Sequence, residues 1–277
     1  MPKERRICTT RGLGPPTSRR GLLRAGLAIG TLALGPRASL GQSGGAHDHM
    51  PELGVANVPV APAMDQPLIE PEVRRSANGV LATRLRCAYA YRDIGGFRLS
   101  LRSYEGGLAP TLRMKPGETL KIRLTNDLPP NRDLVPSITS HPHQFNNTNL
   151  HFHGAHCSPS GIADNVMRLM QPGKSYDIEI ALPADHTRGT YWYHPHFHGS
   201  ADTQVASGMA GAIVVEGDFA DVPEIAQARE RVMLLSEIVF DEDRMIEDFG
   251  TLFPEGSTRF LAINGLRRPV IDMPCKR

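Results

Sequence analysis

Two histidine pairs of the form His-x-His constrain this chain more than any other feature of its sequence. They are His151-Phe152-His153 and His194-Pro195-His196, and nine of the eleven histidines lie between His141 and His198. Successive side chains of a β-strand point to opposite faces, so both imidazoles of such a pair share one face. Two such strands side by side would direct four imidazole rings into one space. The pattern predicts a metal site, and imidazole suits copper, zinc, iron or nickel.

The sequence around these pairs is typical of an all-β domain. From Gly79 onward, short runs of alternating apolar and polar residues recur, as in 97–101, 120–124 and 176–180, and a Pro-Gly pair precedes each of the last two. Turn residues between short strands favour a Greek-key β-sandwich. The apolar run 211–216 predicts a central strand.

The chain divides by this pattern into two units. Residues 79–218 are predicted to form a first β-domain, and residues 219–231 a linker in which 224–231 could form one or two turns of helix. A second unit is expected over 232–277, with a strand in 232–240 and a strand and turn in 261–265. Some 45 residues are too few to bury a core of their own. We therefore expect the second unit to be the start of a domain whose remainder is missing.

The first forty residues resemble an export signal peptide. Ser18-Arg19-Arg20-Gly21-Leu22-Leu23-Arg24 is similar to a twin-arginine export motif. The apolar stretch 25–34 that follows is too short for a bilayer, which takes about 20 apolar residues. We predict a signal peptide over 1–41, a flexible lead-in over 42–78, and a periplasmic or secreted protein without a stable membrane span.

Charge and cysteine content exclude some functions. The formal net charge is +2, which argues against a nucleic-acid-binding surface. None of the four cysteines forms a Cys-x-x-Cys pair, which argues against a zinc ribbon or a thioredoxin-like site. A Cys87–Cys157 disulfide and free thiols both stay open, because sequence alone does not give the geometry.

Both histidine pairs lie in longer segments that resemble one family. Asn149-Leu150-His151-Phe152-His153-Gly154 is similar to the first copper motif of the multicopper oxidases, which include the laccases. Gly189-Thr190-Tyr191-Trp192-Tyr193-His194-Pro195-His196 is similar to the second. The resemblance runs from about Phe97 to Asp272 and implies a cupredoxin-like β-sandwich followed by an incomplete second cupredoxin domain.

The resemblance also implies a function. Multicopper oxidases couple one-electron oxidation of a phenol-like substrate or metal ion to the four-electron reduction of O2 to water. By this resemblance His151 would bind the type 2 copper, and His153, His194 and His196 the type 3 pair, of a trinuclear cluster. The other ligands, and the type 1 copper, belong to a His-x-x-His-x-His and a His-Cys-His motif that this sequence lacks. We expect the chain to bind copper ions, but to turn over O2 and a small reducing substrate only in a complete protein.

The remaining polar residues of the region have plainer interpretations. Asp164 lies where the family has an acidic residue near the type 2 copper, so it is a candidate proton relay, with a simple turn aspartate as the alternative. Trp192 is expected to pack beside the site, and His198 to be its neighbour. His143 is expected in a loop, and His156 and His186 on the surface.

Two other classes of protein compete with an oxidase. One is a non-catalytic, exported copper-binding or copper-resistance module that uses the same four histidines. The other is a zinc or iron hydrolase, because residues 151–156 faintly resemble the His-x-His-x-Asp-His of metallo-β-lactamase-like enzymes. Ala155 stands where that motif has its aspartate, and no alternation of helices and strands supports that fold. Metal analysis and phenol oxidation would separate the three.

Overall fold

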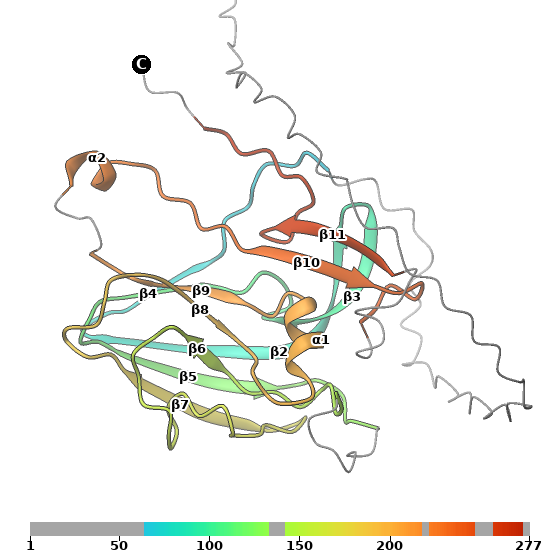
Figure 1. The fold of residues 1–277 in the computed structure, drawn as a ribbon, viewed down its shortest axis with the longest axis horizontal. Coiled ribbons are helices and arrows are strands. Elements are labelled where there is room, and N and C mark those ends of the chain that lie inside the picture. Colours follow the sequence, from blue (N-terminus) through green and yellow to red (C-terminus); the bar gives the residue numbers. More distant parts are fainter. Residues whose placement is uncertain (1–63, 133–141, 218–221, 247–256, 274–277) are drawn as a thin grey trace, which may run out of the picture. The chain divides into compact units, whose positions relative to one another are not determined.

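The computed structural model describes residues 64–132, 142–217, 222–246 and 257–273. All of them belong to one compact unit, residues 56–277. The described chain is mostly β (Figure 1). One sheet has the strand order β1 (Val73–Arg75), β4 (Thr111–Met114), β9 (Gly211–Val215), β8 (Gly189–His194), β6 (His151–His153). The other has the order β3 (Phe97–Tyr104), β2 (Val80–Ile94), β5 (Thr119–Asn126), β7 (Ser175–Ala181).

Three smaller elements complete the described chain. A third, two-stranded sheet pairs β10 (Leu235–Phe240) with β11 (Thr258–Ile263) in antiparallel fashion. The two helices are α1 (Ala201–Ala206) and α2 (Pro223–Ala226). The single turn of α2 lies within the segment 219–231, for which one or two turns of helix are predicted. Neither helix has the length and apolar character needed to cross a membrane, and the predicted signal, 1–41, lies outside the described residues.

The two large sheets share one core. In β5, Leu120, Ile122 and Leu124 are buried while the residues between them face outward, and Ile178 and Ile180 of β7 do the same. These side chains meet residues from the opposite sheet in a single cluster; the opposite sheet contributes Leu112, Met114, Phe152, Tyr193, Ile213 and Val215. The alternating runs therefore formed the strands they predicted, and the fold is a cupredoxin-like β-sandwich.

The apolar sequence of β9 agrees with its central position in the sheet. In its sheet, β9 lies between β4 and β8. Four of its five residues are buried. A strand buried on both faces is expected to read as a continuous apolar run. This confirms the central strand predicted from residues 211–216.

Two strands differ from the sequence prediction. β2 is 15 residues long because its two halves have different partners: Val80–Cys87 pairs with β5, and Cys87–Ile94 with β3. β1 lies inside the predicted lead-in, where Val73–Arg75 pairs in parallel with β4. The described part of that lead-in is therefore ordered. The reason is pairing with distant strands, which a local sequence pattern does not reveal.

The β10–β11 pair has no core of its own. Its buried residues Ile238, Val239 and Phe240 belong to a cluster that includes Leu99 and Leu101 of β3. Phe97 lies 5.0 Å from the Phe240 ring and 6.2 Å from the Phe260 ring, between ring centroids. The packing agrees with the expectation that this segment is too short to bury a core alone. The domain boundaries themselves stay predictions.

Candidate metal centre

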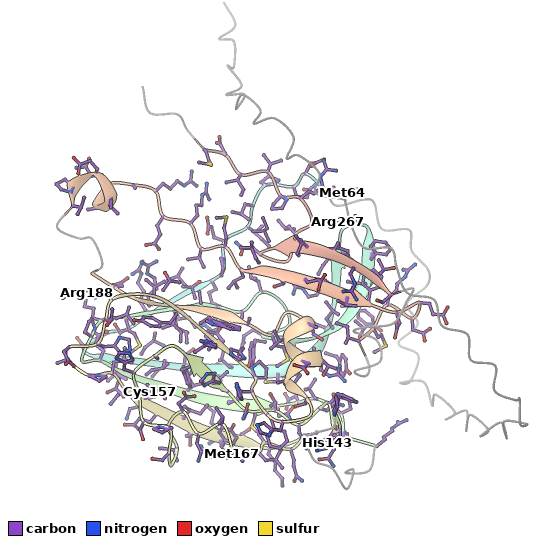
Figure 2. All side chains as sticks on the ribbon, in the orientation of Figure 1. Met64, His143, Cys157, Met167, Arg188 and Arg267 are labelled. Carbon is purple, nitrogen blue, oxygen red and sulfur yellow. The ribbon has the colours of Figure 1, made fainter. Side chains whose placement is uncertain are left out.

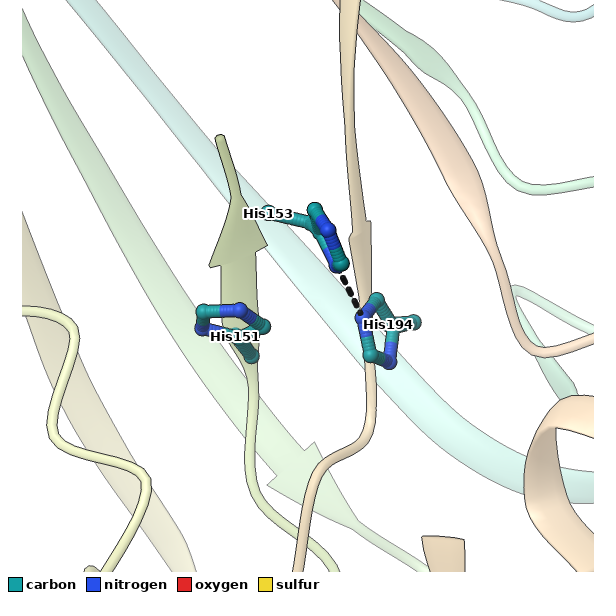
Figure 3. Close-up of side chains that lie close together, drawn as sticks. All are labelled: His151, His153 and His194. Carbon is teal, nitrogen blue, oxygen red and sulfur yellow. Dashed lines mark hydrogen bonds between the residues drawn. The ribbon is translucent and has the colours of Figure 1, made fainter. Parts of the chain in front are cut away.

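Strand pairing brings the two histidine motifs together. β6 lies antiparallel to β8, with His151 opposite His194 and His153 opposite Trp192. One ring nitrogen from each of His151, His153 and His194 lies within 4.8 Å of the others, and Figure 3 shows the three rings facing a common space. The predicted convergence of imidazoles from two adjacent strands is therefore present.

His196 joins this group by a different route from the one predicted. β8 ends at His194, so His194-Pro195-His196 is not a strand segment and the alternation argument is wrong for the second pair. Pro195 has no N–H for a ladder hydrogen bond, which explains the end of the strand. The chain turns, and the His196 ring still comes within 5.0 Å of the His151 ring, centroid to centroid. Its Nδ1 is buried without a hydrogen-bond partner among the described residues.

The His194 ring has a defined protonation state. Its Nδ1 lies 2.8 Å from the Pro195 carbonyl oxygen, which can only accept, so Nδ1 carries the proton. Nε2 is left with its lone pair and lies 3.3 Å from His153 Nδ1, the contact drawn in Figure 3. Burial lowers the pKa of His194 to about 4, although the Pro195 carbonyl opposes the shift. His194 is therefore a neutral imidazole at physiological pH, the form that binds a metal.

The imidazole of His151 contacts the carboxylate of Asp164 through its Nδ1. The Nδ1 of His151 lies 3.0 and 3.1 Å from the two carboxylate oxygens, and the backbone N–H of Phe152 donates to the same carboxylate at 3.1 Å. Asp164 is buried. A carboxylate on Nδ1 favours the tautomer whose Nε2 is free to bind a metal, an arrangement common behind metal-ligating histidines.

Trp192 packs on the imidazoles, as expected from the sequence. Its ring stacks on that of His194 with centroids 4.0 Å apart and an interplanar angle of 22°. It also stacks on His153 at 4.9 Å. The same side chain lines a cavity of about 980 Å³ that reaches His194, His196 and the start of β10. The indole thus packs on two of the imidazoles, and it shares the cavity lining with one of them, His194.

The donor set fits a first-row transition metal. All the converging groups are imidazoles, which suit copper, zinc, iron and nickel. Two imidazole nitrogens bound tetrahedrally to one ion at about 2.0 Å lie about 3.3 Å apart. The His153–His194 nitrogen separation of 3.3 Å is of this size. The Nδ1 of His196 is a further buried nitrogen, and it has no hydrogen-bond partner among the described residues.

The other histidines have structural positions. His198 is exposed in a turn, where it lines the same cavity. His143 lies in a loop as predicted, but it is buried and packs closely on Gly199; its neighbour His141 lies outside the described residues. His156 is exposed, as predicted.

The surface position predicted for His186 is wrong. The side chain is 3% exposed. Its Nδ1 donates to the Thr187 carbonyl at 2.7 Å, and its Nε2 accepts from the His156 N–H at 2.9 Å. Local loop contacts, invisible in the sequence pattern, use both ring nitrogens and leave none for a metal.

Two further points concern residues near the site. Cys87 and Cys157 are free thiols, which decides against the disulfide left open by the sequence. Asn149, which sequence analysis did not single out, is completely buried and contacts the backbone of His196. Its only sequence signal was its place two residues before the first histidine motif.

Comparison with known proteins gives a consistent result. The family described as "Multicopper oxidase" matches residues 103–219. Multicopper oxidase mco of Staphylococcus aureus is 30% identical over 125 residues, which are 45% of this chain and 24% of that protein. Laccase-1 of Thanatephorus cucumeris is 28% identical over 110 residues, 38% of this chain and 16% of that protein. The chain thus spans a quarter or less of these relatives.

Solved structures agree in fold. A multicopper oxidase from Campylobacter jejuni, described as a metallo-oxidase, superposes with a TM-score of 0.57 at 24% identity, over 75% of this chain and 41% of that one. A multi-copper oxidase from Pediococcus acidilactici gives 0.58 at 17% identity, over 79% and 44%. Residues 103–219, which carry both histidine motifs on adjacent strands of this sandwich, are therefore similar in sequence to the multicopper oxidase family, and the described chain shares its fold.

Proposed function

We propose that this chain is the copper-binding portion of a multicopper oxidase and supplies half of the ligands of a trinuclear copper cluster. The observation that carries the proposal is the convergence of His151, His153 and His194, whose ring nitrogens lie within 4.8 Å of one another. His196 is proposed as the fourth ligand, through its ring nitrogen Nδ1, which has no hydrogen-bond partner in the described part of the chain. The remaining ligands would come from histidine motifs that these 277 residues do not contain.

Each histidine has a proposed role taken from the family resemblance. His151 would hold the type 2 copper, and His153, His194 and His196 the type 3 pair. Copper bound there would supply one-electron redox chemistry, so that electrons from a phenol-like substrate or a metal ion reach O2. The chain's own contribution is to hold the imidazoles in place and to keep His194 neutral, with the Pro195 carbonyl holding the proton on Nδ1 of His194.

Asp164 is proposed to orient His151 and to exchange protons near it. Its carboxylate accepts from Nδ1 of His151 and from the Phe152 N–H, so the imidazole is fixed on one side by a buried charge. Reduction of O2 to water consumes protons, and a carboxylate beside the site is a suitable group to pass them.

Copper binding by the purified chain tests the proposal. We expect Cu(II) to bind, and the substitutions His151→Ala and His194→Ala each to lower the bound copper measured by elemental analysis after dialysis. His143→Ala is the control, because His143 is a buried histidine that packs against Gly199 and is not one of the three converging histidines. Equal losses from all three variants would contradict the assignment.

A second candidate function is a copper-binding or copper-resistance module without catalysis. This alternative needs only the imidazoles that converge in the described chain. Oxygen uptake with a phenol separates the two: uptake by a full-length protein that contains this chain supports the oxidase, and copper binding without uptake supports the module. A zinc or iron hydrolase has no support, because the described helices have only six and four residues.

We also propose that the protein is exported to the periplasm or beyond by the twin-arginine route. The support is the sequence Ser18-Arg19-Arg20-Gly21-Leu22-Leu23-Arg24 and the apolar stretch after it. The double substitution Arg19→Lys, Arg20→Lys should leave the protein in the cytoplasm in a cell fractionation experiment. Unchanged export of this variant would exclude the twin-arginine route.

A further inference from the structure

We propose that Asn149 is a positioning residue of the copper site: its carboxamide fixes His196 and the loop of Asp164 in the places that copper binding requires. The inference rests on the proposed function, because it assumes that His196 binds copper. Asn149 lies two residues before β6 and is completely buried. A buried carboxamide needs hydrogen-bond partners, so the partners it has are informative.

Asn149 contacts two separate parts of the site. Its Oδ1 accepts from the backbone N–H of His196 at 2.7 Å, and its Nδ2 donates to the carbonyl oxygen of Val166 at 2.6 Å. The orientation of the carboxamide is settled by these partners, since a backbone N–H only donates and a carbonyl only accepts. One side chain thus joins the strand of His151 to both the second histidine motif and the loop 164–166.

His196 needs such a contact because of Pro195. The β6–β8 ladder ends at the pair His151–His194, so strand pairing does not fix His196. Its ring nitrogen Nδ1 has no partner among the described residues. The Asn149 hydrogen bond therefore holds His196 through its backbone and leaves the imidazole to a ligand.

The second contact of Asn149 acts on the other side of the site. Val166 follows Asp164 by two residues, and the Asp164 carboxylate accepts from His151 Nδ1. Fixing the Val166 carbonyl therefore fixes the loop that orients His151. The groups that orient metal ligands commonly change metal affinity by about 10- to 100-fold when they are removed.

Other contacts hold the segment before Asn149. The carboxamide of Gln204, on α1, donates to the carbonyls of Phe145 and Asn147 and accepts from the hydroxyl of Thr148. The hydroxyl of Ser200 also donates to Asn147. Because α1 already anchors this segment, the side chain of Asn149 has a separate task, which is to hold His196 and the Asp164 loop.

The test uses Cu(II) alone as the probe and the 277-residue chain as the protein. Trp192 is the single tryptophan and stacks on His194, so quenching of its fluorescence reports copper at the site. We expect Asn149→Leu, which lacks both hydrogen-bonding groups, to weaken Cu(II) binding by about 10- to 100-fold. Asn149→Asp keeps an acceptor for the His196 N–H and should recover part of the affinity.

Asn126→Leu is the matched control. Asn126 is also a completely buried asparagine, and its carboxamide contacts the backbone of Asn146, Met170 and Leu128 instead of a histidine motif. Both leucine variants should lose stability in urea, but only Asn149→Leu should change the Cu(II) affinity of the folded protein. Electron paramagnetic resonance should show altered nitrogen hyperfine structure for Asn149→Leu and an unchanged spectrum for Asn126→Leu.

The outcomes separate this inference from the function on which it rests. Suppose that Cu(II) quenches the Trp192 fluorescence of the unaltered chain, and that Asn149→Leu binds Cu(II) with the same affinity and gives the same electron paramagnetic resonance spectrum. The positioning role is then refuted and the copper site stands. Equal weakening by Asn149→Leu and Asn126→Leu would also refute it, since the effect would be one of general stability. If the unaltered chain does not bind Cu(II), the proposed function fails and this inference with it.

Discussion

Replacement of Gly211 by alanine tests the packing beneath the histidines. A Cβ at this position would lie 2.2 Å from Cζ and 2.3 Å from the hydroxyl oxygen of Tyr193. Ordinary contacts between carbon atoms lie at about 3.5–4.0 Å, so the ring would have to move by more than about 1 Å. Tyr193 is completely buried and donates a hydrogen bond to the Pro110 carbonyl at 2.7 Å. It therefore cannot move freely.

The expected cost has two contributions. Overpacking of a well-filled core costs about 1–3 kcal/mol. Displacing the Tyr193 hydroxyl leaves the Pro110 carbonyl without its partner, at about 1–3 kcal/mol for a buried group. Both effects act through one ring and overlap, so we expect Gly211→Ala to lower the free energy of unfolding by about 2–4 kcal/mol. This is a large part of the stability of a typical domain, about 5–15 kcal/mol.

Urea unfolding followed by circular dichroism measures this cost. Gly107→Ala is the matched control, because a Cβ there meets nothing within 4 Å, and its effect should stay within about 1 kcal/mol. The clash with Tyr193 should also appear as coupling: in a Tyr193→Leu background, Gly211→Ala should cost at least about 1 kcal/mol less. Equal stability of the Gly211→Ala and Gly107→Ala variants would refute the reasoning.

Three further predictions concern the neighbourhood of the site. Asp164→Ala should weaken Cu(II) binding by about 10- to 100-fold in a fluorescence titration, because it leaves His151 Nδ1 without its acceptor, and Asp164→Asn should have a smaller effect. Burial, and to a smaller extent the charge of Asp164, raises the pKa of the Cys157 thiol to about 12. At pH 8 iodoacetamide should therefore alkylate Cys157 much more slowly in the native protein than in urea, as measured by peptide mass spectrometry, and the rate in the native protein should rise with pH. Gly199→Ala should lower the melting temperature, because Gly199 has φ +95° and a Cβ would lie 2.6 Å from His143 Nδ1; an unchanged melting temperature would contradict this.

Sequence reasoning recovered the parts of the fold that follow from local periodicity. The alternation in 120–124 and 176–180 predicted β5 and β7, because each strand buries one face against the same core. The apolar run at 211–216 predicted a strand covered on both sides. These elements need only the rule that side chains alternate along a strand.

The remainder depends on contacts between distant segments. β1 exists because Val73–Arg75 finds β4, and no alternation in three residues could indicate this. His186 is buried because its ring fills a loop and bonds the His156 N–H. His196 reaches the site through Asn149 and not through strand alternation. In each case a specific hydrogen bond between remote residues decides the position, and a single sequence carries no direct signal of such a bond.

The residue between the histidines of the first motif explains how the protein can form the site before any metal binds. Phe152 lies directly opposite Tyr193 in the β6–β8 pair, and both side chains are buried in the sandwich core. A slip of one residue would turn these aromatic rings to the outer face and bury imidazoles instead. The core therefore fixes the register, and the register in turn places His151 and His153 on the same face as His194. Folding without metal is the consequence: a chelator should remove copper from this chain without unfolding it, whereas unfolding on chelation would show that the metal, and not the Phe152–Tyr193 pair, holds the two motifs together.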